Sequence, residues 1–261
     1  MTSSQCRKQA KERLKGSYSE GFFVTAIVLA AFIIFKIADT VQSAVILYNN
    51  GGNAESLFVS RGIWDFTMKA ALSFLCFVLT SPLITGGVWW YFQTARGGDN
   101  RSILKLYTGF KLNVRAIRLY MSIWFLSMLS LLPSGICFAG AYELFSYLPK
   151  AEDQPFMLFI TIQVFVLGIA LLGLYLRCVT ALLPAPFIFI SQPDRGVFSV
   201  LKMSSNIMRG SKTEALKLIL IYIVMMLPIV TVPFVLPKAV MSLSVFSCDR
   251  MGVEVSGETG I

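Results

Sequence analysis

The chain has 261 residues, of which 56% are hydrophobic and 14% are charged. An ordinary soluble domain is excluded, because about a quarter of the residues in such domains are charged. The apolar residues also come in runs long enough to cross a bilayer, which takes about 20 residues of helix. We therefore expect one all-α, polytopic membrane domain, residues 1–261, with five or six transmembrane helices.

The formal net charge is +9, and the chain contains no histidine. The basic residues lie between the apolar runs, so we expect no nucleic-acid binding and interpret them as topology signals and as contacts to anionic lipid. The absence of histidine removes the usual general base and the commonest metal ligand. The five cysteines form no Cys-x-x-Cys pair, so we expect no metal site and no structural disulfide.

Residues 1–20 are rich in Lys and Arg and are predicted to stay in the cytoplasm. The run 21–48 is the first predicted span. A signal peptide is the competing interpretation, but its apolar region would have about 7–15 residues, and this run is far longer. Lys36 and Asp39 lie one turn apart near the outer end of the run, and we expect them to form an ion pair on the helix surface.

The second predicted span is 67–95, with Pro82 inside it. The loop before it is poor in positive charge and is predicted to be extracytoplasmic, whereas the loop 96–118 is rich in Arg and Lys and is predicted to be cytoplasmic. Inside this second loop, apolar residues follow an i, i+3, i+4, i+7 pattern, which predicts a short basic amphipathic helix. They are Ile103, Leu106, Tyr107 and Phe110.

The third run, 117–148, contains Pro133, and we expect one kinked helix rather than two. Glu143 lies toward its outer end. The fourth run, 156–190, would be roughly 52 Å long as a helix, against a hydrocarbon core of about 30 Å. It must therefore tilt or break at Pro184 and Pro186, and in both cases Arg177 has apolar residues on both sides.

The stretch 191–217 predicts a second basic amphipathic helix, with Asp194 as its N-cap. Lys202 and Arg209 lie opposite an apolar stripe, so we expect the helix to lie in the headgroup layer. The alternative is a cytoplasmic loop helix packed on its own protein. The stripe consists of Val197, Val200, Leu201, Ile207 and Met208.

The two basic helices follow the same order of span, turn, amphipathic helix and span. Aligning Ile103-Leu104-Lys105 with Val200-Leu201-Lys202 gives an offset of 97 residues. A duplicated unit would suit a transport fold built from parallel repeats, although similar interfacial loops can also arise by convergence.

The final run, 215–248, is interrupted by three prolines. A single kinked span would leave the end of the chain outside. Two short helices hinged around Pro233 would return it to the cytoplasm, and we favour this hairpin because Pro233 lies near the centre of the run. Residues 249–261 are predicted to be a polar tail.

Four motifs extend over nearly the whole chain. They are Ala10-Lys11-Glu12-x-Leu14-Lys15-Gly16, Ser81-Pro82-Leu83 with Gly86-Gly87, Leu106-Tyr107-x-Gly109-Phe110, and Pro193-Asp194 followed by Ser204 and Met208-x-Gly210. With them the chain resembles a bacterial integral-membrane family known only as domain of unknown function 975. The chain departs from the family where TALLPAPFIFI replaces an aromatic-rich pattern after Arg177. Since the family has no established activity, the resemblance implies topology rather than function.

No catalytic motif supports an enzyme. Phosphate loops and dinucleotide fingerprints are missing, and zinc-protease and Ser-His chemistry need histidine. A Ser81 and Lys69 dyad would lie about 18 Å apart along one helix, outside hydrogen-bond reach. We therefore expect a non-enzymatic protein without a cofactor.

The candidate intramembrane charge site is Arg177 with Glu143, because ionisable groups at that depth often mark pathways. A snorkelling Arg177 is the alternative interpretation. The predicted headgroup contacts are Arg101, Lys105, Lys111, Lys202, Arg209 and Lys212.

For function, we expect a protein of the bacterial cytoplasmic membrane, with a cytoplasmic N-terminus, that contacts anionic headgroups and also a protein partner or a second copy of itself. The alternative is a small-solute transporter or channel with Arg177 in an inward-facing site.

Overall fold

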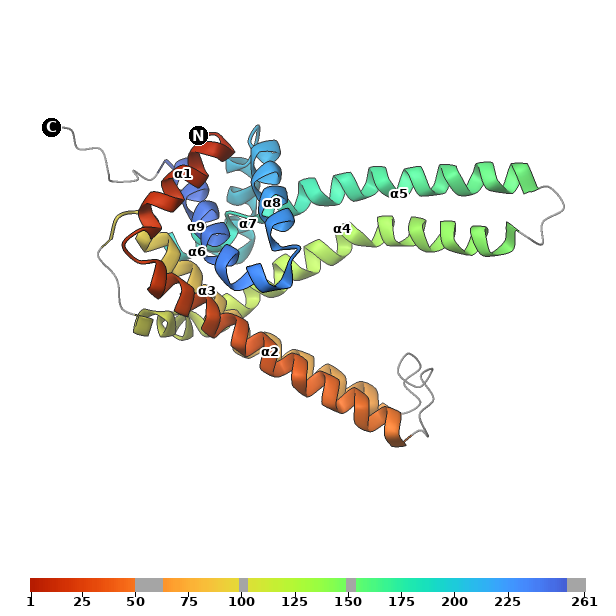
Figure 1. The fold of residues 1–261 in the computed structure, drawn as a ribbon, viewed down its shortest axis with the longest axis horizontal. Helices are drawn as coiled ribbons and strands as arrows, with labels where there is room; N and C mark the ends of the chain where they lie inside the picture. The colour runs from red at the N-terminus through yellow and green to blue at the C-terminus, as the bar shows by residue number, and fades with distance from the viewer. Residues whose placement is uncertain (50–62, 99–102, 149–153, 253–261) are drawn as a thin grey trace. The chain divides into compact units, whose positions relative to one another are not determined.

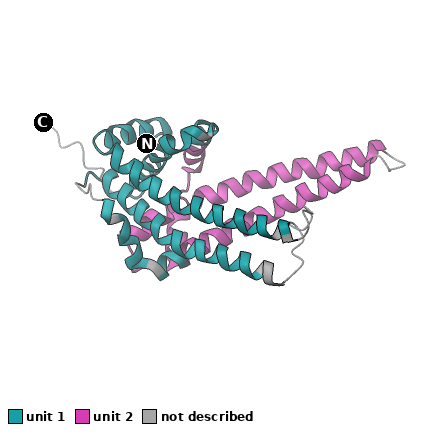
Figure 2. Cartoon of the chain, turned by 60° about the horizontal axis from the view of Figure 1, so that its bottom comes forward, with its two compact units in different colours: residues 1–117, 220–261 teal, residues 118–219 magenta. Residues whose placement is uncertain are grey.

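A computed structural model describes residues 1–49, 63–98, 103–148 and 154–252, and these residues form helices and turns without a strand (Figure 1). The all-α prediction is confirmed. The described chain divides into two compact units, one of Met1–Ile117 with Leu220–Ile261 and one of Arg118–Ile219 (Figure 2).

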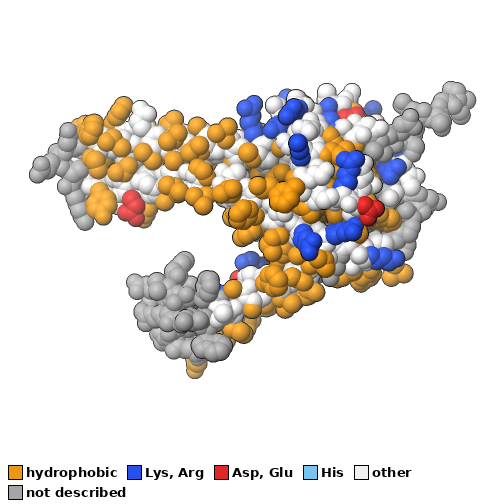
Figure 3. Space-filling model, turned by 180° about the vertical axis from the view of Figure 1, so that it is seen from behind, with side chains coloured by type: hydrophobic (Ala, Val, Ile, Leu, Met, Phe, Trp, Pro, Cys, Tyr) orange, Lys and Arg blue, Asp and Glu red, His pale blue; other side chains and the backbone are white. Residues whose placement is uncertain are grey.

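Five helices among the described residues are long and apolar enough to cross a membrane, as predicted for a polytopic protein. Hydrophobic side chains coat the long helices, whereas Lys and Arg gather around the shorter ones (Figure 3). The five candidate spans are Tyr18–Val45, Thr67–Ala95, Val114–Tyr147, Gln154–Ser191 and Val232–Arg250.

In the first unit, α2 (Tyr18–Asn49) and α3 (Ile63–Ala95) form an antiparallel pair. The hydroxyl of Tyr91, near the end of α3, donates to the carbonyl oxygen of Gly21 at 2.7 Å and lies 2.6 Å from Oγ1 of Thr25. A buried phenol needs such partners, since an unpaired polar atom away from water is costly. The bonds fix the start of α2 beside the end of α3.

The basic N-terminal segment forms α1 (Ser3–Leu14), which the sequence analysis did not predict as a helix. Thr2 and Gln5 cap it reciprocally, and Cys6, Ala10 and Leu14, spaced four residues apart, are buried. The helix packs along α9 (Val232–Arg250). The Thr-x-x-Gln sequence and the four-residue spacing were the available signals.

The final apolar run forms two helices, α8 (Lys212–Met226) and α9, as in the alternative that we favoured. They are joined by a single 3₁₀ turn, η4 (Ile229–Thr231), directly after Pro228. The break is therefore not at Pro233, which lies in the first turn of α9, where its missing N–H has no intrahelical partner to lose.

The predicted polar tail starts too early, because Asp249 and Arg250 belong to α9. The Asp249 carboxylate accepts a hydrogen bond from the amino group of Met1 at 3.0 Å, and Arg250 donates to the carbonyl oxygen of Met1 at 3.1 Å. The rest of the predicted tail, from residue 253, lies outside the described residues.

In the second unit, α4 (Asn113–Tyr147) continues through Pro133 as one helix, as predicted. The next helix, α5 (Gln154–Leu182), ends just before Pro184, and α6 (Ala185–Ser191) follows, so the long apolar run breaks at the first of the two expected prolines. Ser134 of α4 donates to the carbonyl oxygen of Gly168 in α5 at 3.0 Å. These two residues set the register of the α4–α5 pair.

Candidate functional site

The 3₁₀ helix η2 (Ile103–Leu112) lies against α3 with almost no side chain between the two backbones. A Cβ on Gly86 would overlap the carbonyl oxygen of Leu106, and a Cβ on Gly109 would overlap that of Pro82. Such close approach is open to glycine only. Two of the motifs that carried the family resemblance therefore meet in the fold.

The predicted stripe of η2 is wrong in its periodicity. A 3₁₀ helix has three residues per turn, so residues three apart share a face. Leu106 and Gly109 point to α3 and are buried, whereas Leu104, Tyr107 and Phe110 form the opposite face and are exposed. In an α-helix, as predicted, Leu106, Tyr107 and Phe110 would share one face.

The helix α7 (Val197–Ile207) buries most of its predicted apolar stripe inside the second unit. Val200, Leu201 and Met208 are buried, and Ser204 donates to the carbonyl oxygen of Ala181 in α5 at 2.7 Å. This packing matches the alternative of a helix seated on its own protein, because the stripe is not available to lipid.

The outer face of α7 carries a different apolar group. Phe198 is 81% exposed, and the cationic Lys202 lies one turn further along the helix and is also exposed. The N-cap is Gly196 rather than the predicted Asp194. Phe198 was not among the predicted contacts, although its i+4 spacing to Lys202 can be seen in the sequence.

The predicted headgroup contacts differ in their surroundings. Lys111, Lys202 and Arg209 are exposed, and Lys212 is half-buried. Arg101 lies outside the described residues, as does the side chain of Lys105. The exposed members are thus placed where a ligand can reach them.

The proposed repeat is not reproduced residue by residue. Each unit holds an apolar helix pair followed by a short helix that packs back on the second member of the pair. However, the offset of 97 aligns Leu104, which is 75% exposed, with Leu201, which is 6% exposed. The short helices also differ in type, 3₁₀ against α.

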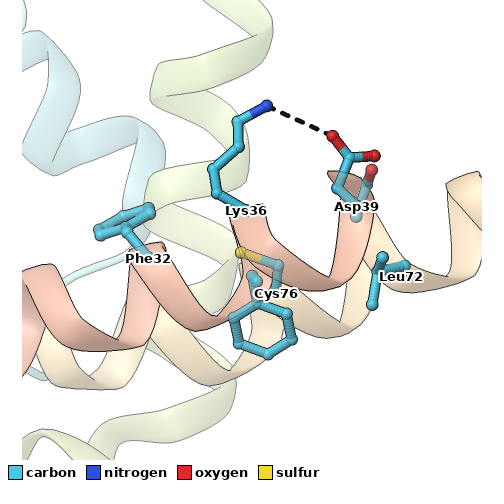
Figure 4. A pocket seen from close by; sticks show the side chains of 7 residues that line it. Phe32, Lys36, Asp39, Leu72 and Cys76 are labelled. Atoms are coloured by element: carbon cyan, nitrogen blue, oxygen red, sulfur yellow. Dashed lines mark hydrogen bonds and ion pairs between the residues drawn. The ribbon is translucent and has the colours of Figure 1, made fainter. Parts of the chain in front are cut away.

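Lys36 and Asp39 form the predicted ion pair on the surface of α2, with Nζ and Oδ2 3.4 Å apart (Figure 4). They border a small hollow between α2 and α3 of about 210 Å³, lined also by Phe32, Leu72 and Cys76. Lys36 is 81% exposed. It lies roughly 27 Å along the helix from Tyr18, close to the thickness of about 30 Å of a hydrocarbon core.

Arg177 and Glu143 are not brought together. Ser134 and Gly168 lie level in the antiparallel α4–α5 pair, with Glu143 nine residues toward one end and Arg177 nine residues toward the other. The rise of a helix then separates them by roughly 27 Å along the axis. Glu143 is therefore not the carboxylate partner of Arg177, and both side chains are exposed.

The thiol of Cys6, on α1, has an altered acidity. Burial, reinforced by the negative charge of Asp249, raises the pKa of Cys6 from 9.0 to about 11. A thiol with such a pKa is protonated at neutral pH and is a poor nucleophile. All five cysteines are free, and the described residues hold no group of His, Cys, Asp and Glu that could bind a metal ion.

Long apolar helices with a Lys- and Arg-rich surface around the shorter helices define a polytopic helical protein of membrane type. The family model described as "Protein of unknown function (DUF975)" matches residues 1–247, and the chain belongs to this family. Comparisons with curated proteins and with solved structures found no match.

Proposed function

We propose that the protein is a non-enzymatic multi-pass protein of the bacterial cytoplasmic membrane that binds anionic lipid at its cytoplasmic side, with no cofactor. The observation that supports it most is the outer face of η2. Leu104, Tyr107 and Phe110 are exposed there beside the exposed cation of Lys111. Apolar and aromatic side chains next to a cation suit the headgroup layer.

The second contact is the outer face of α7. Phe198 is exposed one turn from Lys202, and no structural need for an exposed phenylalanine is evident within the second unit. Inserting the ring among lipid headgroups would bury it, while the lysine meets a phosphate. In both units the side chains proposed to contact lipid are therefore those that do not pack against other helices of the protein.

The same proposal includes the topology. The helix α9 differs from the other candidate spans because half of its most apolar window is buried and the basic α1 packs along it. A helix that carries Arg7, Lys8 and Lys11 cannot lie in hydrocarbon without a large cost. We infer four crossings, α2 to α5, with α1 and α9 together on the cytoplasmic side.

Lipid binding is tested with the purified full chain in neutral detergent, by counting bound phosphatidylglycerol and phosphatidylcholine in native mass spectra. The parent is expected to retain more phosphatidylglycerol. The triple variant Lys111→Gln, Lys202→Gln, Arg209→Gln should lose this preference, because the headgroup charge is no longer matched. Replacement of Lys111 and Lys202 by Arg and of Arg209 by Lys keeps the charge and is the control. Equal retention of both lipids by the parent would refute the proposal.

The transporter alternative gains no geometric support from the separation of Arg177 and Glu143. The protein partner or second copy also stays a prediction. The exposed apolar side chains of α4 and α5 are compatible with lipid or with another membrane helix.

A further inference from the structure

A groove of about 760 Å³ lies in the first unit, where α1, the start of α2 and the start of α9 meet. Its volume falls within the roughly 300–1,000 Å³ of small-molecule sites. Four lysines and one glutamate line it, together with Leu14 and Tyr18. The lysines are Lys8, Lys11, Lys15 and Lys238.

The secondary structure explains why these cations converge. Lys8, Lys11 and Lys15 are spaced i, i+3 and i+7 and so share one side of the N-terminal helix. The adjoining side buries Cys6, Ala10 and Leu14, of which Leu14 also borders the groove. Packing of that apolar side therefore turns the lysines outward into the groove.

The fourth cation comes from a distant part of the sequence and is held in place. Nζ of Lys238 lies 5.7 Å from the centre of the Tyr18 ring, a cation–π contact. The Tyr18 hydroxyl donates to the carbonyl oxygen of Phe234 at 3.0 Å, which ties the start of α2 to α9. The Tyr18 ring, which lines the groove, is thus tied to α9.

The charges of the groove are not balanced by the protein. In the described part of the chain, none of the four lysines forms an ion pair with a carboxylate, and Glu12 is the single acidic residue of the lining. Like charges held close together repel each other, so an anion that enters gains from several cations at once. Tyr18 also begins the apolar helix α2, so in the topology proposed above the groove lies at the level of the headgroup phosphates.

We propose that this groove is a binding site for a phosphate group with two negative charges, carried either by a phospholipid headgroup or by a soluble phosphorylated compound. Lysine ammonium groups bind phosphate as point charges and need no fixed planar geometry. The site is distinct from the outer faces of η2 and α7, which share none of its residues.

The test uses the full chain and two probes. Inorganic pyrophosphate is titrated calorimetrically against protein in neutral detergent, and phosphatidic acid is offered in phosphatidylcholine nanodiscs and counted by native mass spectrometry. The groove variant is Lys11→Gln, Lys15→Gln, Lys238→Gln. We expect it to bind at least one probe about tenfold more weakly or worse, since hydrogen bonds to charged groups are strong.

Loss of pyrophosphate binding identifies a soluble source, and loss of phosphatidic acid alone identifies a lipid source. The matched control is Lys36→Gln, Arg118→Gln, Lys217→Gln, which removes the same charge at exposed positions outside the groove, η2 and α7 and should bind both probes like the parent. The Lys→Arg version of the groove variant should keep binding and shows that the fold tolerates these positions. The proposal is overturned if the parent binds neither probe, if the groove variant binds like the parent, or if the control loses as much.

Failure of this site is distinguishable from failure of the proposed lipid preference. The preference for phosphatidylglycerol is measured on the variant Lys111→Gln, Lys202→Gln, Arg209→Gln, whereas the phosphate site is measured on the groove variant. A protein with the preference and without the site would bind phosphatidylglycerol through η2 and α7 alone.

Discussion

Gly86 of α3 and Leu106 of η2 touch through their backbones, so that a single added methyl group at Gly86 would overlap the carbonyl oxygen of Leu106. Neither residue has a polar or ionisable side chain. Their contact holds η2 against the helix pair of the first unit and turns the Tyr107 and Phe110 side chains outward. The proposed lipid contact of η2 therefore depends on a glycine in another helix.

Gly86→Ala is expected to destabilise the protein by about 1–3 kcal/mol, because the new methyl group meets backbone that cannot move aside. Gly87→Ala is the matched control, since its Cβ would meet side-chain atoms at 3.7–3.8 Å, an ordinary contact. Thermal unfolding of the full chain in detergent measures both. Without the close contact, Gly86→Ala would stabilise the protein, because alanine has a higher helix propensity than glycine. A higher unfolding temperature for Gly86→Ala would therefore contradict the close backbone contact.

Tyr91→Phe should cost about 1 kcal/mol, because it removes a buried hydrogen bond to Gly21 and one partner of the Thr25 hydroxyl. Tyr142→Phe is the control, since Tyr142 is exposed on α4. The control should stay within about 0.5 kcal/mol of the parent. Equal unfolding midpoints for parent and Tyr91→Phe would contradict the structural role of the Tyr91 hydroxyl.

Cys6 should react slowly with maleimide. Its pKa of about 11 means that the thiolate, the reactive form, is about 100-fold scarcer at pH 8 than for a thiol of ordinary pKa. Below pH 11 the rate should rise about tenfold for each step of one pH unit, because deprotonation limits it. The control is Ser4→Cys in a variant with Cys6→Ala, since Ser4 is exposed on the same helix. Equal rates at the two positions would show that Cys6 is not buried.

The topology predicts one-sided labelling. In a chain whose native cysteines are replaced by alanine, Lys111→Cys and Lys202→Cys should react with an impermeant thiol reagent only from the cytoplasmic side. Ser146→Cys, near the opposite end of α4, should react only from outside. Labelling of positions 111 and 202 from opposite sides would refute the alternation of spans and basic loops.

The span ends were predictable because they depend on local composition. The predicted runs 21–48 and 67–95 lie close to the candidate spans Tyr18–Val45 and Thr67–Ala95. As expected, one helix continues through Pro133, and the fourth apolar run breaks at Pro184. Transfer of a segment into lipid depends mainly on its own side chains, and backbone hydrogen bonds force it to be helical. A span can therefore be predicted without knowing which segments lie beside it.

The candidate site was predicted less well, because it depends on partners far away in the sequence. Lys111, Lys202 and Arg209 were identified and are exposed, but the apolar groups beside them were misassigned. The predicted stripe of η2 requires 3.6 residues per turn, whereas η2 is a 3₁₀ helix against α3. The predicted stripe of α7 was expected to face lipid, but it packs on protein.

The sequence by itself determined that this is an all-α protein with apolar spans, basic connections and no histidine chemistry, since hydropathy and residue type act locally. Only the tertiary structure decided that α1 packs on α9, that four lysines share a groove and that Arg177 lies far from Glu143. Such contacts join segments that are far apart in the sequence, and they depend on which surfaces are complementary. A periodic pattern identifies the apolar face of a helix, but it does not identify the element that packs against that face.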